Sequence, residues 1–169
     1  MNIVETERLA LCELKVEDAP FIFELLNSPG WLQYIGDRGI NSLDDAIGYI
    51  VNGPQVSYKK NGFGLYLTKL KTDGTPVGIC GLIKRDSLPH VDIGFAFLPQ
   101  YSGKGYAFES AAAIIENARD VQQLDTVVAI TSKDNERSIQ LLNKIGLTFK
   151  STIQLQGDDE ELFLFEVTF

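Results

Sequence analysis

The chain has 169 residues, of which 44% are hydrophobic and 22% charged, and its formal net charge is −8. This length and composition are typical of one soluble globular domain, which we place at residues 1–169. The acidic charge argues against nucleic acid as a partner. No apolar run approaches the roughly 20 residues that span a bilayer, and the polar first residues are not a signal peptide, so we expect a cytoplasmic protein that does not bind membranes.

Some features of the composition leave alternatives open. The negative charge suits a small cationic substrate, but the same charge is equally common as a plain aid to solubility. The two cysteines, Cys12 and Cys80, both lie in apolar strand-like runs. We interpret them as buried thiols in a reducing compartment rather than as a disulfide. The oligomeric state is open, with a homodimer as one alternative.

Hydrophobic periodicity divides the chain into strands and helices. Alternating or short apolar runs predict strands, whereas apolar side chains three to four positions apart predict helices. The aromatic-rich stretch 31–39 predicts no regular element. In chain order, we expect a strand at 9–14, helices at 17–26 and 42–51, strands at 63–68, 77–83 and 91–99, a helix from 107, a strand at 126–130, a helix capped by Asp134 or Asn135, and strands at 148–155 and 162–169.

This order of elements, β-α-α-β-β-β-α-β-α-β-β, predicts an α/β fold in which helices cover both faces of a mixed sheet. The run Thr126–Ile130 is apolar on both faces, which is typical of an interior strand. Ser42 and Asp45 match a capping signature at the start of the second helix.

A glycine-spaced turn lies between the strand at 91–99 and the following helix. Unpaired amides and a partial positive charge make a helix N-terminus a good site for phosphate. Glycines 103 and 105 let a ligand approach the backbone, and Lys104 adds a positive charge. The alternative is a plain strand-to-helix turn that uses glycine for geometry alone. The residues of the turn are Gln100, Tyr101, Ser102, Gly103, Lys104, Gly105, Tyr106 and Ala107.

The pattern Gln-x-x-Gly-x-Gly, after a strand that ends in Leu98-Pro99, resembles the acetyl-CoA-binding motif of the GNAT superfamily of N-acetyltransferases. Residues 135–138, followed by a helix and Gly146-Leu147, resemble the family's second signature, in which Phe usually follows the glycine. The amino-acid sequences of these motifs are most similar to those of the ribosomal-protein N-terminal acetyltransferases, the RimJ/RimL-like branch. The resemblance spans the chain and implies a sheet that splays near Phe95 and Ala129 to admit the cofactor.

The resemblance implies acetyl-CoA as the co-substrate, no metal, and direct transfer to a primary amine in a ternary complex. The acceptor would be a peptide N-terminal α-amine or a small amine. The cofactor pyrophosphate would lie on the amides of the turn, the pantetheine arm beside the preceding strand, and an oxyanion donor at the N–H of Phe97 or Leu98. A non-catalytic acyl-CoA-binding module on the same fold is the alternative function.

The candidate catalytic residues are Asp92 and Ser138. Asp92 is the only acid in the strand before the turn, on the opposite face from Ile93, and is our candidate base, directly or through water. The alternative for Asp92 is a partner for Lys84 or Arg85. Many family members place a thiolate-protonating Tyr where this chain has Leu142, so the resemblance suggests Ser138 as the substitute. Local hydrogen bonding would be the alternative for Ser138. Asn135 would contact the pantetheine arm, cap its helix, or do both.

Overall fold

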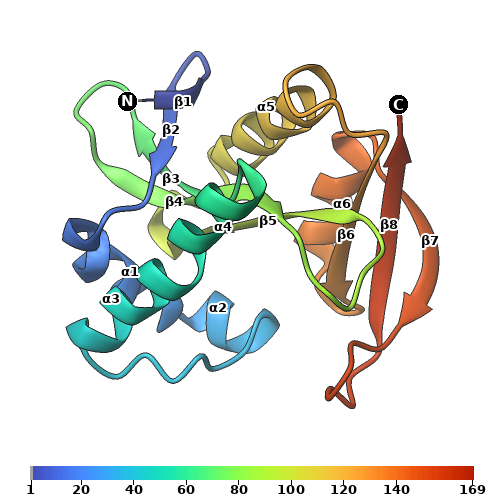
Figure 1. Cartoon of the computed structure of the whole chain (residues 1–169), viewed down its shortest axis with the longest axis horizontal. Coiled ribbons are helices and arrows are strands. Elements are labelled where there is room, and N and C mark those ends of the chain that lie inside the picture. The colour runs from blue at the N-terminus through green and yellow to red at the C-terminus, as the bar shows by residue number, and fades with distance from the viewer. Residues whose placement is uncertain (1) are drawn as a thin grey trace.

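The computed structural model describes residues 2–169, and Met1, the first residue of the predicted domain, lies outside the described residues. Helices cover both faces of a single eight-stranded sheet (Figure 1). The strands are β1 (Asn2–Glu5), β2 (Leu9–Glu13), β3 (Leu65–Leu70), β4 (Pro76–Ile83), β5 (Val91–Phe97), β6 (Thr126–Ser132), β7 (Thr148–Ile153) and β8 (Leu162–Thr168). The helices are α1 (Ala19–Leu26), α2 (Pro29–Tyr34), α3 (Leu43–Asn52), α4 (Pro54–Asn61), α5 (Tyr106–Asp120) and α6 (Glu136–Lys144), with 3₁₀ turns at Val16–Asp18 and Pro99–Tyr101.

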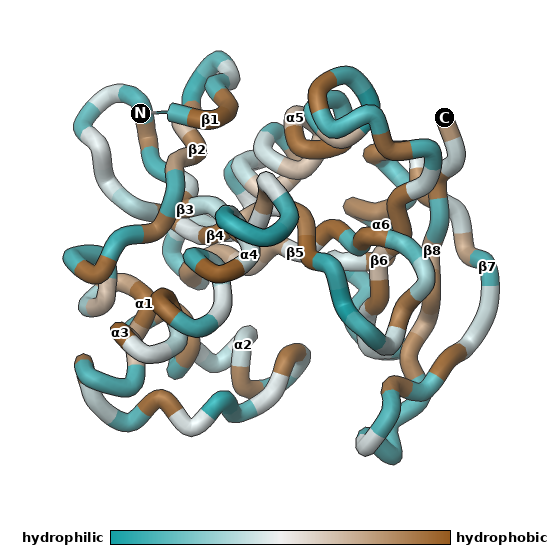
Figure 2. The backbone as a smooth tube through the Cα atoms, viewed as in Figure 1, coloured by the Kyte–Doolittle hydropathy of each residue, from teal (hydrophilic) through white to brown (hydrophobic). Residues whose placement is uncertain are grey.

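The strands follow the order β1-β2-β3-β4-β5-β6-β8-β7 across the sheet. Every neighbouring pair is antiparallel except β5 and β6, which run parallel. This mixed sheet confirms the predicted α/β fold. Figure 2 shows hydrophobic colouring along β6, which lies between β5 and β8, and hydrophilic colouring along the loop between β4 and β5. The predicted interior position of the Thr126–Ile130 run is therefore confirmed.

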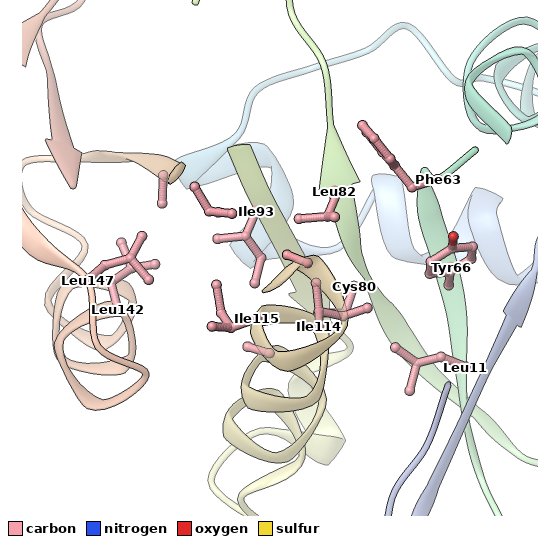
Figure 3. Close-up of a cluster of buried hydrophobic side chains, with 14 of the residues drawn as sticks. Leu11, Phe63, Tyr66, Cys80, Leu82, Ile93, Ile114, Ile115, Leu142 and Leu147 are labelled. Carbon is pink, nitrogen blue, oxygen red and sulfur yellow. The ribbon is translucent and has the colours of Figure 1, made fainter. Parts of the chain in front are cut away.

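The two faces of the sheet carry separate hydrophobic cores. Side chains of α1, α2 and α3 form one core with Leu67, Ile79 and Leu98. On the other face, Ile114 and Ile115 of α5 point toward the sheet (Figure 3). Each fully buried side chain of this size contributes about 2 kcal/mol relative to the exposed state. The α5 core thus fixes the helix, and with it the preceding glycine turn, against β4 and β5.

The sheet opens between β5 and β6. Only two residue pairs join these strands, Val91 with Val127 and Asp92 with Val128, and the strands separate beyond them. In contrast, β6 pairs with β8 along its whole length. The predicted splay near Phe95 and Ala129 is therefore confirmed, and it leaves one backbone edge of β5 without a neighbouring strand.

Three elements differ from the sequence predictions. The stretch expected to be irregular contains the end of α2, because Pro29 is suited to a first helical position and Trp31 is buried. Gly53 and Pro54 end α3 as expected, but Pro54 also starts α4. Finally, the polar start of the chain forms β1, which pairs with β2. These elements have short or weak apolar patterns, and tertiary contacts stabilise them.

Both predicted helix caps are present in the structure. The Ser42 hydroxyl accepts a hydrogen bond from the Asp45 amide at 3.1 Å, as a helix cap does. Of the two candidate caps for α6, Asn135 is the cap, since its side chain accepts from the Ser138 amide at 3.3 Å. Cys12 and Cys80 are free thiols as predicted, but only Cys80 is buried, and burial raises its pKa to about 12, whereas Cys12 is partly exposed. Among residues 2–169 no helix has both the length and the apolar character needed to cross a bilayer.

Candidate active site

A cleft of about 980 Å³ lies where β5 and β6 diverge. Its walls come from β5, the turn before α5, the start of α6, and the α2, α3 and α4 region. Ten of the thirteen predicted site residues line this cleft. They are Asp92, Phe97, Tyr101, Ser102, Gly103, Gly105, Tyr106, Ala107, Asn135 and Ser138.

Three predicted residues do not line the cleft. Leu98 is buried, and with Gln100 it lines a separate, smaller cavity of about 330 Å³ beside α1. Lys104 is exposed, and its backbone carbonyl accepts a hydrogen bond from Arg8. The side chains of Gln100 and Lys104 therefore lie outside the cleft, and both residues belong to the turn through their backbone.

The glycine turn presents a row of unpaired amides. Gly103 and Gly105 have φ angles of +77° and +83°, a left-handed conformation that glycine adopts at little cost. Gly105 is the N-cap of α5 and offers no side chain to cap it, unlike Ser42 and Asn135 at the other helices. Within residues 2–169, the N–H groups of 103–108 donate to no acceptor. A run of free amides at a helix N-terminus is a binding surface for phosphate oxygens.

A clamp from the start of β2 holds this turn, and no sequence pattern indicated it. The Arg8 guanidinium donates to the Glu109 carboxylate at 2.7 Å and to the Lys104 carbonyl at 2.9 Å, and it lies 4.6 Å from the centre of the Tyr106 ring. Burial raises the pKa of Glu109, but hydrogen bonds from Thr6 and Arg8 outweigh it and hold this pKa below its usual value. Glu109 is therefore an ion-pair partner that fixes the first turn of α5.

The register of β4 and β5 determines which β5 amides face the opening. Leu98 donates its N–H to the Val77 carbonyl at 3.0 Å, so these residues form a hydrogen-bonded antiparallel pair. Bonded and non-bonded pairs alternate along an antiparallel ladder, so the N–H groups of Phe95 and Phe97 point away from β4, toward the splay. Of the two predicted oxyanion donors, only Phe97 thus has a free amide, and Phe95, which was not predicted, has a free amide on the same side.

Asp92 lies at the closed end of the splay and is only 1% exposed. The Arg85 Nε atom donates to both of its carboxylate oxygens, at 3.2 and 3.3 Å. Burial raises the pKa of Asp92 to about 6, although the nearby positive charge of Arg85 acts in the opposite direction. The predicted pairing of Asp92 with Arg85 thus exists. A carboxylate with a pKa of about 6 is mostly ionised at pH 7, so the paired Asp92 can still accept a proton.

The start of α6 brings two predicted polar residues into the cleft. Asn135 uses its side-chain oxygen for the cap, which leaves its amide nitrogen free. The Ser138 hydroxyl has no hydrogen-bond partner among the described residues, so the local bonding that was its alternative does not occur. Leu142, one turn further on, is 1% exposed and packs in the core with Leu147 (Figure 3).

Aromatic residues of the helical region form the opposite wall. Trp31, Tyr34 and Tyr49 line the cleft. Asp158 and Asp159 are exposed in the loop between β7 and β8 and are not part of its lining. Within the described part of the chain, no three His, Cys, Asp or Glu side chains group as metal ligands.

The family model of the acetyltransferase (GNAT) domain matches residues 8–148. The chain therefore belongs to the GNAT family and has the fold of its acetyltransferases. Two proteins of Bacillus subtilis (strain 168) are similar in sequence. The uncharacterized protein YkkB is 28% identical over 152 residues, which cover 88% of this chain and 87% of that protein. The uncharacterized N-acetyltransferase YoaA is 26% identical over 147 residues, with coverage of 85% and 81%.

Solved structures agree with this assignment. An acetyltransferase from Agrobacterium tumefaciens has a TM-score of 0.83 at 25% identity and is matched over 98% of this chain and 94% of its own. RimL, a ribosomal-protein α-N-acetyltransferase in complex with coenzyme A, has a TM-score of 0.84 at 15% identity, with coverage of 99% and 98%. At 15% identity, the similarity to RimL shows a shared fold and nothing more. The predicted family is confirmed, and a ribosomal-protein acetyltransferase is among the structures that share the fold.

Proposed function

We propose that this protein transfers the acetyl group of acetyl-CoA directly to a primary amine, either a peptide N-terminal α-amine or a small amine, in a ternary complex. The observation that carries the proposal is the junction of two sets of free backbone donors in one cleft. One set is the amide row of 103–108, and the other is the edge of β5 at Phe95 and Phe97.

The cofactor would lie along these two sets of donors. Its pyrophosphate would accept hydrogen bonds from the amides of 103–108. The pantetheine amides would pair with the free edge of β5, as a further strand would. The free amide nitrogen of Asn135 faces the same cleft and is available to a pantetheine carbonyl. Acetyl-CoA supplies a thioester whose carbonyl carbon is open to attack by an amine.

The residues of the chain would stabilise the negative charge that develops on the carbonyl oxygen, remove a proton from the amine, and supply a proton to the leaving thiolate. The N–H of Phe97 or Phe95 would stabilise the carbonyl oxygen. At about 3.3 Å per residue, these amides lie roughly 16 and 10 Å along the strand from Asp92. This spacing favours the water-mediated route for proton removal by Asp92. The unengaged Ser138 hydroxyl would give its proton to the leaving thiolate and regain one from solvent.

A thiol-release screen tests the function. Acetyl-CoA is offered with four classes of amine, namely peptides with a free N-terminus, amino acids, polyamines and aminoglycosides, and free coenzyme A is followed with a thiol reagent. Release that requires the amine, with acetylated amine found by mass spectrometry, is the expected result. Tight acetyl-CoA binding without release from any class would instead favour the non-catalytic acyl-CoA-binding module.

A further inference from the structure

The charge of the cleft is opposite to that of the protein. The chain carries a net charge of −8, with 23 acidic and 15 basic residues. Yet the cleft is lined by six Lys or Arg residues and only two Asp residues, a formal excess of four positive charges. The net charge therefore gives no support for a cationic acceptor, because a substrate responds to the local electrostatic potential of the cleft. The six basic residues are Arg38, Lys60, Lys84, Arg85, Arg137 and Lys144.

The positive charge divides between two parts of the cleft. Arg137 and Lys144 belong to α6, which packs against α5 on the face of the sheet that carries the glycine turn. These two side chains suit the phosphates of the cofactor. The other four basic residues come from the α2–α3 connection, α4 and the loop after β4, in the wall that carries the aromatic residues. The phosphates at the turn do not account for this second group.

Within the described residues, this second wall carries free donors, and beside Arg85 it also carries one free carboxylate, that of Asp86. Arg85 uses its Nε atom for Asp92, and its two terminal nitrogens donate to no acceptor among residues 2–169. Arg38 forms no ion pair in the same range. The indole N–H of Trp31 is buried and has no partner among the described residues.

Arg38, Arg85 and Tyr49 all line the cleft. Burial raises the pKa of Tyr49, and the positive charges of Arg38 and Arg85 both act in the opposite direction. Two guanidinium groups with free N–H donors in one wall match a planar anion that accepts several hydrogen bonds.

We infer that the acceptor is a primary amine that carries a carboxylate, which binds between Arg38 and the free nitrogens of Arg85 while its amine faces the thioester. This inference rests on the proposed function. An acidic side chain close to a peptide N-terminus and a small amino acid both have this chemistry. Lys60 and Lys84 at the same wall add attraction over a longer range, which weakens as salt is raised.

The test compares tripeptides that differ only in the charge of the second residue. Ala-Glu-Ala, Ala-Gln-Ala and Ala-Lys-Ala, each with an amidated C-terminus, share one N-terminal amine and thus a similar amine pKa. We expect kcat/KM in thiol release to be about fivefold to twentyfold higher for the Glu peptide than for the Gln peptide, with the Lys peptide lowest. Added salt should reduce the advantage of the Glu peptide.

Variants assign the effect to the wall. Arg38→Gln should lower the Glu-to-Gln ratio about threefold or more and leave acetyl-CoA affinity unchanged, since Arg38 is exposed and has no ion pair to lose within the described residues. Arg119→Gln is the matched control, because Arg119 lies at the end of α5 outside the cleft lining and should leave the ratio unchanged.

The outcomes separate this inference from the function itself. Turnover with equal rates for the Glu and Gln peptides, or with a preference for the Lys peptide, would overturn the carboxylate assignment and leave the acetyltransferase intact. O-phosphoethanolamine used far better than the Glu peptide would assign the donors to a phosphate and would also overturn it. Absence of thiol release with every amine, while acetyl-CoA still binds, would overturn the proposed function and the inference together.

Discussion

Replacement of Asp92 by Asn should change how the stability of the protein depends on pH. The Asp92 carboxyl has a pKa of about 6 in the folded protein, against 3.8 as its ordinary value, because burial disfavours its charged form. Between these two values the unfolded chain loses the proton while the folded protein keeps it. Folding is therefore penalised progressively as pH rises from about 4, and the full penalty is present above pH 6.

The size of this penalty follows from the pKa difference. A pKa difference of about 2 between the folded and unfolded protein changes the free energy of unfolding by about 3 kcal/mol, at about 1.4 kcal/mol for each pKa unit. The Asp92 side chain is 2% exposed, so solvent screening does not reduce this value much. The carboxamide that replaces the carboxyl group in the variant does not titrate. We therefore expect the stability of Asp92→Asn relative to wild type to rise by about 3 kcal/mol between pH 3.5 and 7.5.

Urea denaturation of both proteins across this pH range measures the difference. Asp120→Asn is the control, because Asp120 also contacts an arginine, Arg119, but is exposed, and its pKa is lowered by that hydrogen bond. Its stabilising effect is present above its ordinary pKa and is lost as pH falls, so its replacement should give a weak trend of opposite sign. A stability difference between Asp92→Asn and wild type that stays constant from pH 3.5 to 7.5 would refute the raised pKa.

The same carboxylate predicts a kinetic signature. If Asp92 accepts the proton of the amine through water, kcat/KM for a confirmed acceptor should fall below about pH 6, and this decline should disappear in Asp92→Asn. Arg85→Gln removes a charge that lowers the pKa of Asp92, so the decline should begin at a higher pH. Superimposable pH profiles for wild type and Asp92→Asn would remove Asp92 from the mechanism.

Three further variants test the proposed cofactor site and the proposed proton donor. Gly105→Val should weaken acetyl-CoA binding at least about tenfold in titration calorimetry, or about 1.4 kcal/mol, because a Cβ at this position would lie 3.1 Å from the Arg8 guanidinium and disturb the contact that holds the turn. Gly157→Val, at the same φ of +83° in an exposed turn with no atom near its Cβ, controls for backbone strain. Ser138→Ala should lower kcat about tenfold to a hundredfold with nearly unchanged cofactor affinity, whereas equal loss of both would indicate a structural serine. Arg8→Gln removes the donor to the Lys104 carbonyl and should raise the Kd of acetyl-CoA about threefold to tenfold while the KM of the amine stays constant.

The sequence by itself determined the features that depend on neighbouring residues. Each of these features depends on residues that are close in the sequence, so the sequence alone predicts the local backbone geometry. They are the glycines at 103 and 105, the helix caps at Ser42 and Asn135, and the periodicity of α5. Because the two family motifs consist of such local features, the fold and the position of the glycine turn before α5 could be predicted.

The tertiary structure alone decided which distant groups meet in the cleft. Arg8 contacts the turn across 96 positions of sequence, and Arg38 and Arg85 line the same cleft. The register of β4 and β5 leaves the Phe97 amide free and engages that of Leu98, although the two are adjacent in the chain. Net charge sums over every residue, whereas a substrate meets only the residues that folding places around it, and for this reason an acidic chain contains a basic cleft.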